Sequence, residues 1–135
     1  MVLVDTSVVL DVLQDDPVWA TWSIAQMRAH AQLHELVINP MIYAELSAAF
    51  SHMEALDEVL AQLQLAVQPI PKPALFLAGK AFVAYRRRGG TRTQVPLDFF
   101  IGAHAAVKGW PLLTRDPRRF RSAFVGLAVI APQVG

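Results

Sequence analysis

The sequence predicts an α/β domain, a three-layer α/β/α sandwich in which helices cover both faces of a mainly parallel sheet. Short apolar runs alternate along the chain with longer segments in which apolar residues recur at helical spacing. Three helical segments open on a proline beside a capping residue or an acid, as Asp16-Pro17, Asn39-Pro40 and Pro96 to Asp98. Strands that alternate with helices favour parallel pairing through crossovers. We expect one domain, residues 1–135, with one core.

The N-terminal half begins with a buried strand that ends in an acid. Val2 to Val4 is short and apolar, Asp5 follows it, and Thr6 or Ser7 can cap the next helix. The remaining elements expected in this half are a helix over 17–33, a strand over 36–38, a helix over 41–50, an amphipathic helix over 54–63 and a strand near 65–68.

The C-terminal half repeats the pattern. A long helix over 74–88 is closed by Gly89-Gly90, and Pro96 fits the first turn of an apolar helix that Gly109 ends. A strand over 110–114 then leads to Asp116, where Pro117 starts a new turn, and residues 127–130 form the last strand. Parallel sheets bind ligands at the carboxyl ends of their strands, so acids at such ends indicate a site.

Composition excludes several classes of function. The chain has no cysteine, so it has no disulfide, thiolate zinc site or cysteine nucleophile, in keeping with a reducing cytoplasm. Asp5 and Asp11 interrupt the N-terminal apolar run, which argues against a signal peptide, and no apolar run is long enough to span a membrane. The net charge is only +1, but arginines cluster at 86–92 and 115–121.

Four carboxylates stand beside apolar runs: Asp5, Glu45, Asp98 and Asp116. Any one of them alone is best explained as a helix cap or a solvated acid. Together they differ, because Asp5, Asp98 and Asp116 fall at the site-forming edge of the predicted sheet and Glu45 starts a helix that leaves it. Clustered carboxylates repel unless a cation joins them, and hard oxygen ligands suit Mg²⁺ or Mn²⁺. Thr6, Ser7 and Thr114 either orient these carboxylates or serve as ordinary caps.

The motifs VDTSVVLDVL, NPMIYAELSAAF and LDFFIGAHA followed by LLTRD resemble, in order, those of PIN domains, and more narrowly of VapC-type toxin ribonucleases. The resemblance covers essentially the whole chain. It implies that Asp5, Glu45, Asp98 and Asp116 form the family's acidic quartet. It also implies that the protein is an Mg²⁺- or Mn²⁺-dependent endoribonuclease. The partners it implies are RNA, a cognate antitoxin and a second copy of the chain. A further acid that some family members carry after Asp116 is absent, which leaves open whether a second metal ion binds.

Other polar residues are assigned to structure or left open. Asp11 falls about 240° around the helix from Asp5, so we expect it to be solvated. His104 is expected to be a hydrogen-bonded core residue, and His30 and His34 to lie at a wet helix end. Arg86, Arg87 and Arg88 either bind RNA phosphates or form a solvated helix end, and Arg115 is placed to touch a phosphate or an acid.

Two other functions fit the same residues. One is a DNA-directed nuclease of similar fold, which cleavage of matched RNA and DNA strands distinguishes. The other is a non-catalytic RNA- or protein-binding domain, which an activity assay with Mn²⁺ distinguishes.

Overall fold

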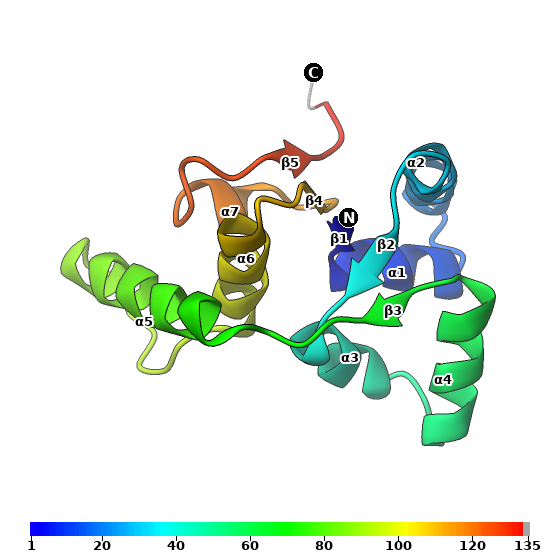
Figure 1. The fold of residues 1–135 in the computed structure, drawn as a ribbon, viewed down its shortest axis with the longest axis horizontal. Coiled ribbons are helices and arrows are strands. Elements are labelled where there is room, and N and C mark those ends of the chain that lie inside the picture. The colour runs from blue at the N-terminus through cyan, green and yellow to red at the C-terminus, as the bar shows by residue number, and fades with distance from the viewer. Residues whose placement is uncertain (134–135) are drawn as a thin grey trace.

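A five-stranded parallel sheet lies at the centre of the molecule, in the order β3-β2-β1-β4-β5. The computed structural model describes residues 1–133. The strands are β1 (Val2–Val4), β2 (Leu36–Ile38), β3 (Ala66–Val67), β4 (Leu112–Leu113) and β5 (Val129–Ile130). The three-layer sandwich predicted from the sequence is confirmed: α5 and α6 lie on one side of the sheet, and α1 and α2 lie on the other (Figure 1).

The helices follow the predicted order with small shifts at their ends. They are α1 (Thr6–Leu13), α2 (Ala20–Ala31), α3 (Pro40–Ser47), α4 (Met53–Gln62), α5 (Lys72–Arg87), α6 (Leu97–Lys108) and the short α7 (Arg118–Arg121). None of the helices in residues 1–133 combines the length and the apolar character needed to cross a membrane.

Capping side chains stand before two of these helices. The expected helix over 17–33 begins only at Ala20; before it, Asp16 Oδ1 accepts hydrogen bonds from the backbone N–H groups of Val18 and Trp19, and the Asp16 carbonyl accepts from the Ala20 N–H, so residues 17–19 form a turn that leads into α2. Asn39 caps α3 as expected, since its Oδ1 accepts from the N–H groups of Met41 and Ile42. Pro96 is the N-cap of α6 rather than a residue of its first turn.

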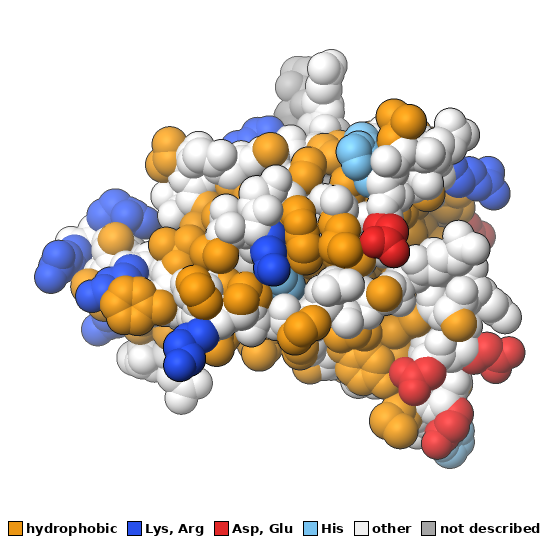
Figure 2. Space-filling view, viewed as in Figure 1, with side chains coloured by type: hydrophobic (Ala, Val, Ile, Leu, Met, Phe, Trp, Pro, Cys, Tyr) orange, Lys and Arg blue, Asp and Glu red, His pale blue; other side chains and the backbone are white. Residues whose placement is uncertain are grey.

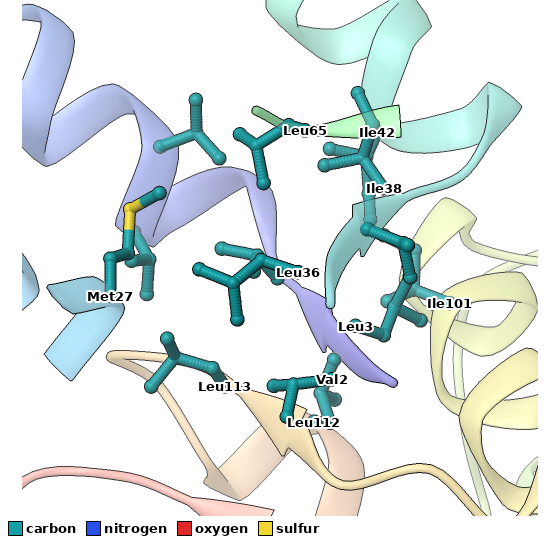
Figure 3. Close-up of a cluster of buried hydrophobic side chains, with 14 of the residues drawn as sticks. Val2, Leu3, Met27, Leu36, Ile38, Ile42, Leu65, Ile101, Leu112 and Leu113 are labelled. Atoms are coloured by element: carbon teal, nitrogen blue, oxygen red, sulfur yellow. The ribbon is translucent and has the colours of Figure 1, made fainter. Parts of the chain in front are cut away.

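The main core lies around the three inner strands. Val2, Leu3, Leu36, Ile38, Leu112 and Leu113 are buried there with Met27, Ile42 and Ile101 from the covering helices (Figure 3). A strand buried on both faces needs apolar residues at every position, which is why these strands read as continuous apolar runs. A second cluster joins α5 to α6, where Ala74 and Ala78 pack against Phe99 and Ala103.

Strand pairing brings the N-terminal segment beside residues 112–114. Val4 on β1 pairs with Leu113 on β4, and the Asp5 N–H donates to the Leu113 carbonyl over 2.9 Å. Asp5 and Thr114 are therefore the next residues along two neighbouring parallel strands. Because parallel strands end at the same edge, the loop from β4 to α7 lies beside the first turn of α1.

Candidate functional site

Asp5 is the most deeply held acid at this edge, with 1% of its surface exposed. Its Oδ2 accepts three hydrogen bonds of 2.9 Å, from Ser7 Oγ, Thr114 Oγ1 and Arg119 Nη2. Its Oδ1 is buried with no hydrogen-bond partner in the described residues. A buried carboxylate oxygen without a partner is costly, so this atom is suited to a ligand that the protein itself does not provide.

Two hydroxyls connect Asp5 to the β4–α7 loop. Ser7 Oγ accepts from the Arg115 N–H at 3.3 Å, and Thr114 Oγ1 accepts from the Asp116 N–H at 3.0 Å. Each hydroxyl donates its single proton to Asp5 Oδ2, so the direction of both chains of hydrogen bonds is fixed. We call Ser7 and Thr114 the hydroxyl bridges. They position Asp116 relative to Asp5.

Asp116 and Asp5 share one cation. Arg119 Nη2 lies 2.9 Å from Asp5 Oδ2, while its Nε lies 3.5 Å from Asp116 Oδ2. Asp116 is 54% exposed, in contrast to Asp5. Arg119 lies on α7, directly after the loop that carries Asp116, so the loop and the helix place a carboxylate and a guanidinium side by side.

Glu45 is tied to the same region through Thr6. Thr6 Oγ1, in the first turn of α1, donates to Glu45 Oε1 over 2.6 Å. Asn39 fixes the start of α3 and hence the helical turn that carries Glu45. Thr6 and Ser7 make no side-chain cap of α1; the structure therefore shows them bound to carboxylates, the first of the two alternatives that the sequence left open.

Asp98 lies in the first turn of α6, where the free N–H groups favour a carboxylate. It lines a hollow of about 230 Å³ together with three arginines, Arg88, Arg92 and Arg119. Tyr85 lies in the same hollow. Hydrogen bonds donated to its phenol oxygen lower the pKa of Tyr85, chiefly the bond from the Arg92 backbone N–H, with a further one from the Thr91 backbone N–H. The hollow combines positive charge with an acid, which suits a phosphate group beside a cation.

The four acids do not by themselves complete a metal cage. Within residues 1–133, no three acidic or histidine side chains are grouped closely enough to hold a metal ion. The donor set is nevertheless suited to Mg²⁺ or Mn²⁺, since it consists of carboxylate oxygens and one of them is buried without a partner. The roles of Asp5, Glu45, Asp98 and Asp116 as metal ligands stay predictions.

The family model described as PIN domain matches residues 2–124. The chain belongs to the PIN domain family.

Solved structures share the fold of this PIN domain. VapBC2 from Rickettsia felis, bound to a promoter DNA fragment, superimposes with a TM-score of 0.76 at 17% identity, over 98% of this chain and 100% of that one. DNA-bound VapBC from Salmonella typhimurium gives 0.72 at 20%, and FitAcB from Neisseria gonorrhoeae gives 0.68 at 22%, each over 96% of both chains. No curated protein sequence matches significantly. At identities this low, the structural likeness establishes a common fold and nothing beyond it.

The prediction for Asp11 is wrong. Asp11 is 2% exposed, and its Oδ2 accepts from Ser23 Oγ on α2 and from Arg115 Nε, both at 2.9 Å. The angular estimate correctly separated it from Asp5, but α2 packs on the face where the acid lies. Arg115 therefore has a structural partner in this PIN domain, and contact of Arg115 with RNA stays a prediction.

The predicted basic run divides in two. Arg88 lines the hollow beside Asp98, whereas Arg86 Nη1 donates to the carbonyls of Gly90 and Arg92 and so braces the loop after α5. Figure 2 shows Lys and Arg side chains gathered over the free end of α5, with acidic side chains over α4 on the opposite side. Sequence reasoning did not single out Arg119. The sequence feature that points to Arg119 is its spacing: it lies three residues after Asp116 near the start of a helix, where side chains three residues apart are neighbours.

His104 is the buried core residue expected from the sequence. Because Asn39 Oδ1 accepts the capping N–H groups, the Asn39 Nδ2 points to His104 Nδ1 at 3.2 Å and donates to it. The proton of the neutral ring then lies on Nε2, which is buried without a partner. Burial, with a smaller contribution from the charge of Lys108, lowers the pKa of His104 below 6.5.

Proposed function

We propose that this PIN domain is an Mg²⁺- or Mn²⁺-dependent endoribonuclease and the toxin of a toxin–antitoxin pair. The observation that carries the proposal is the buried, unpartnered Oδ1 of Asp5 at the sheet edge that also holds Asp116. Support comes from membership of the PIN family and from similar folds in complexes named VapBC and FitAcB. A bound divalent ion supplies an activated water and positive charge beside the scissile phosphate.

Asp5 and Asp116 are the residues that we expect to hold the ion, with Glu45 and Asp98 completing its surroundings. The hydroxyl bridges fix the orientation of Asp5, since both donate to Oδ2 and leave Oδ1 to face the ligand. Thr6 fixes Glu45 in the same way. A carboxylate not bound to the ion would accept the proton of the attacking water as its oxygen bonds to phosphorus, and that proton would pass to the leaving oxygen as the other P–O bond breaks, so no histidine is required.

Arg88 and Arg92 supply the expected contact with RNA phosphates. Both line the hollow that contains Asp98, so a phosphate held there lies beside an acid of the proposed site. Arg86 supports this surface indirectly, because it holds the carbonyls of the loop that carries Arg92. We expect Arg87 and Arg115 to add charge near the strand rather than to fix the scissile group.

The proposed antitoxin fits an apolar groove beside α2. This groove, of about 290 Å³, is lined by Val12, Ile24, Met27, Arg28, Ala31, Leu36, Gln62 and Leu63. It lies along α2, the helix expected over 17–33. Co-expression with the neighbouring small gene is expected to yield a complex with reduced cleavage; separate elution with full activity counts against it.

A homodimer completes the proposal. α5 exposes Leu75, Phe76 and Val83, with Phe76 exposed over 67% of its surface, and association of two copies would remove this apolar surface from water. Light scattering of the purified chain gives its mass in solution.

Cleavage of matched single strands tests the central claim. The purified protein is incubated with an RNA and a DNA of the same sequence, in Mn²⁺ and in EDTA. We expect RNA to be cut only with Mn²⁺, and DNA not to be cut. Equal cutting of both strands would indicate a DNA-directed or unselective nuclease. Binding of RNA without cutting in any divalent ion would indicate a non-catalytic domain.

A further inference from the structure

Arg119 occupies a position that conflicts with a metal ion. Its guanidinium contacts Asp5 at 2.9 Å and lies 3.5 Å from Asp116, the two acids to which the proposed function assigns the ion. A divalent cation on Asp5 Oδ1 would lie within a few ångström of this fixed positive charge, where like charges repel strongly in a partly buried setting. The same contact also keeps Asp116 turned toward the arginine.

We propose that Arg119 is a built-in counter-ion that exchanges with the metal ion at Asp5 and Asp116. In the metal-free protein the guanidinium neutralises the two carboxylates. When an ion binds, Arg119 leaves Asp116 and its contact with Asp5 weakens. This inference rests on the proposed function, because it assumes that the acids bind a divalent ion.

Three features of the structure support exchange over a permanent ion pair. Arg119 uses Asp5 Oδ2 and leaves the buried Oδ1 unpartnered, so the pair does not satisfy the carboxylate. Its side chain is 39% exposed and its contact with Asp116 is long, so the guanidinium has solvent beside it to move into, while its Cζ lies 5.1 Å from the Phe120 ring centroid. It also lines the hollow with Arg88, Arg92 and Asp98, which gives the released guanidinium a place on the proposed phosphate-binding surface.

The chain contains its own control for this behaviour. Arg115 pairs with Asp11 at the same distance, 2.9 Å, and Ser23 donates to the same oxygen, Oδ2, but Asp11 Oδ1 is not among the fully buried side-chain atoms of residues 1–133 that lack a partner. Each arginine also lies over an aromatic ring, Arg115 Cζ at 5.8 Å from the Trp19 centroid and Arg119 Cζ at 5.1 Å from the Phe120 centroid, so stacking does not distinguish the two. A metal ion has no reason to displace Arg115, so the two arginines are expected to respond differently to the same titration.

Titration of the wild-type protein with Mg²⁺, followed by NMR of the arginine Nε–H groups, tests the exchange without a mutation. We expect the Arg119 signal to shift and its hydrogen exchange to accelerate as Mg²⁺ binds, while the Arg115 signal stays unchanged. An Arg119 signal that stays unchanged while calorimetry shows Mg²⁺ binding overturns the inference.

Substitution gives the second measurement. Arg119→Gln is expected to bind Mn²⁺ about tenfold more tightly than wild type, because a positive charge is removed from the site. Its metal-free form should melt lower, and Mn²⁺ should raise its melting temperature further. Arg119→Lys keeps the charge and should stay close to wild type in Mn²⁺ affinity. Arg121→Gln, on the same helix but with no ion pair in residues 1–133, is the matched control.

The outcomes separate this inference from the proposed function. Unchanged or weaker Mn²⁺ affinity in Arg119→Gln, or an equal gain in Arg121→Gln, overturns the exchange while leaving a metal-dependent nuclease intact. A wild-type protein that neither binds Mn²⁺ nor cuts RNA overturns both.

Discussion

Two buried aspartates, Asp5 and Asp11, are each paired with an arginine from the same short segment of the chain, yet they have different environments. Asp11 accepts from Ser23 and Arg115 on Oδ2, and its Oδ1 is not among the fully buried atoms of residues 1–133 that lack a partner; these interactions fasten α1 to α2 and to the β4–α7 loop. Asp5 has three donors on one oxygen and none on the other. Burial and ion pairing are therefore common to both acids, and the complete burial of the unpartnered oxygen distinguishes the candidate site from the structural pair.

The largest expected effect comes from exchanging the acids for amides. Asp5→Asn should lower the rate of RNA cleavage by more than about 100-fold, since changes to partners of a ligand alone cost roughly 10–100-fold. Asp11→Asn should keep most of the cleavage rate and lose about 1–3 kcal/mol of unfolding free energy, because Arg115 is only partly buried. Cleavage assays and urea denaturation of both variants measure the contrast. Equal loss of activity in the two would remove the distinction drawn between them.

A smaller effect is expected from the hydroxyls that serve each acid. Thr114→Val removes the donor to Asp5 and the acceptor for the Asp116 N–H, and should reduce cleavage by roughly 10–100-fold. Ser23→Ala removes a donor to Asp11 and should cost about 1–2 kcal/mol of stability while sparing cleavage. The comparison fails if Ser23→Ala is the less active of the pair at a temperature where both are folded.

The smallest effect concerns the second orphaned atom, Nε2 of His104, which is outside the acidic site. Because burial lowers the pKa of His104 below 6.5, the unfolded chain binds a proton more readily than the folded one. The contribution to stability is therefore present above pH 6.5 and is lost as the pH falls through 6.5 toward the lower folded pKa. Unfolding free energies measured across this range should show the loss in wild type and a flatter profile in His104→Gln. A profile that is the same in both proteins would assign the pH dependence to other groups.

The fold was largely predictable from the sequence because its signals are local. Continuous apolar runs mark β1 and β2, and the Asn39-Pro40 pair marks the start of α3 with a cap that the structure contains. Errors arose at element ends, where the same capping bonds precede a helix at once after Asn39 but a turn over residues 17–19 after Asp16.

The site was predictable only in part, because its interactions join residues that are far apart in the chain. The positions of Asp5 and Asp116 follow from strand ends, but the link between them depends on Arg119. Its spacing accounts for the contact with Asp116, whereas no local pattern specifies its contact with Asp5. Asp11 was placed correctly on its helix and wrongly in solvent, since nothing in the helical spacing tells which neighbour covers that face. The same holds for Arg86, which bends back to its own loop.

The hydroxyl bridges also make the chemistry of Asp5 observable from a distance. Each bridge runs from a backbone N–H, through one hydroxyl, to the same carboxylate oxygen. A change in charge at Asp5 alters how strongly Ser7 and Thr114 donate, and hence how strongly they accept from the two amides, because linked hydrogen bonds polarise one another. The amide proton resonances of Arg115 and Asp116 are thus spectroscopic reporters for an atom more than 100 residues earlier in the chain.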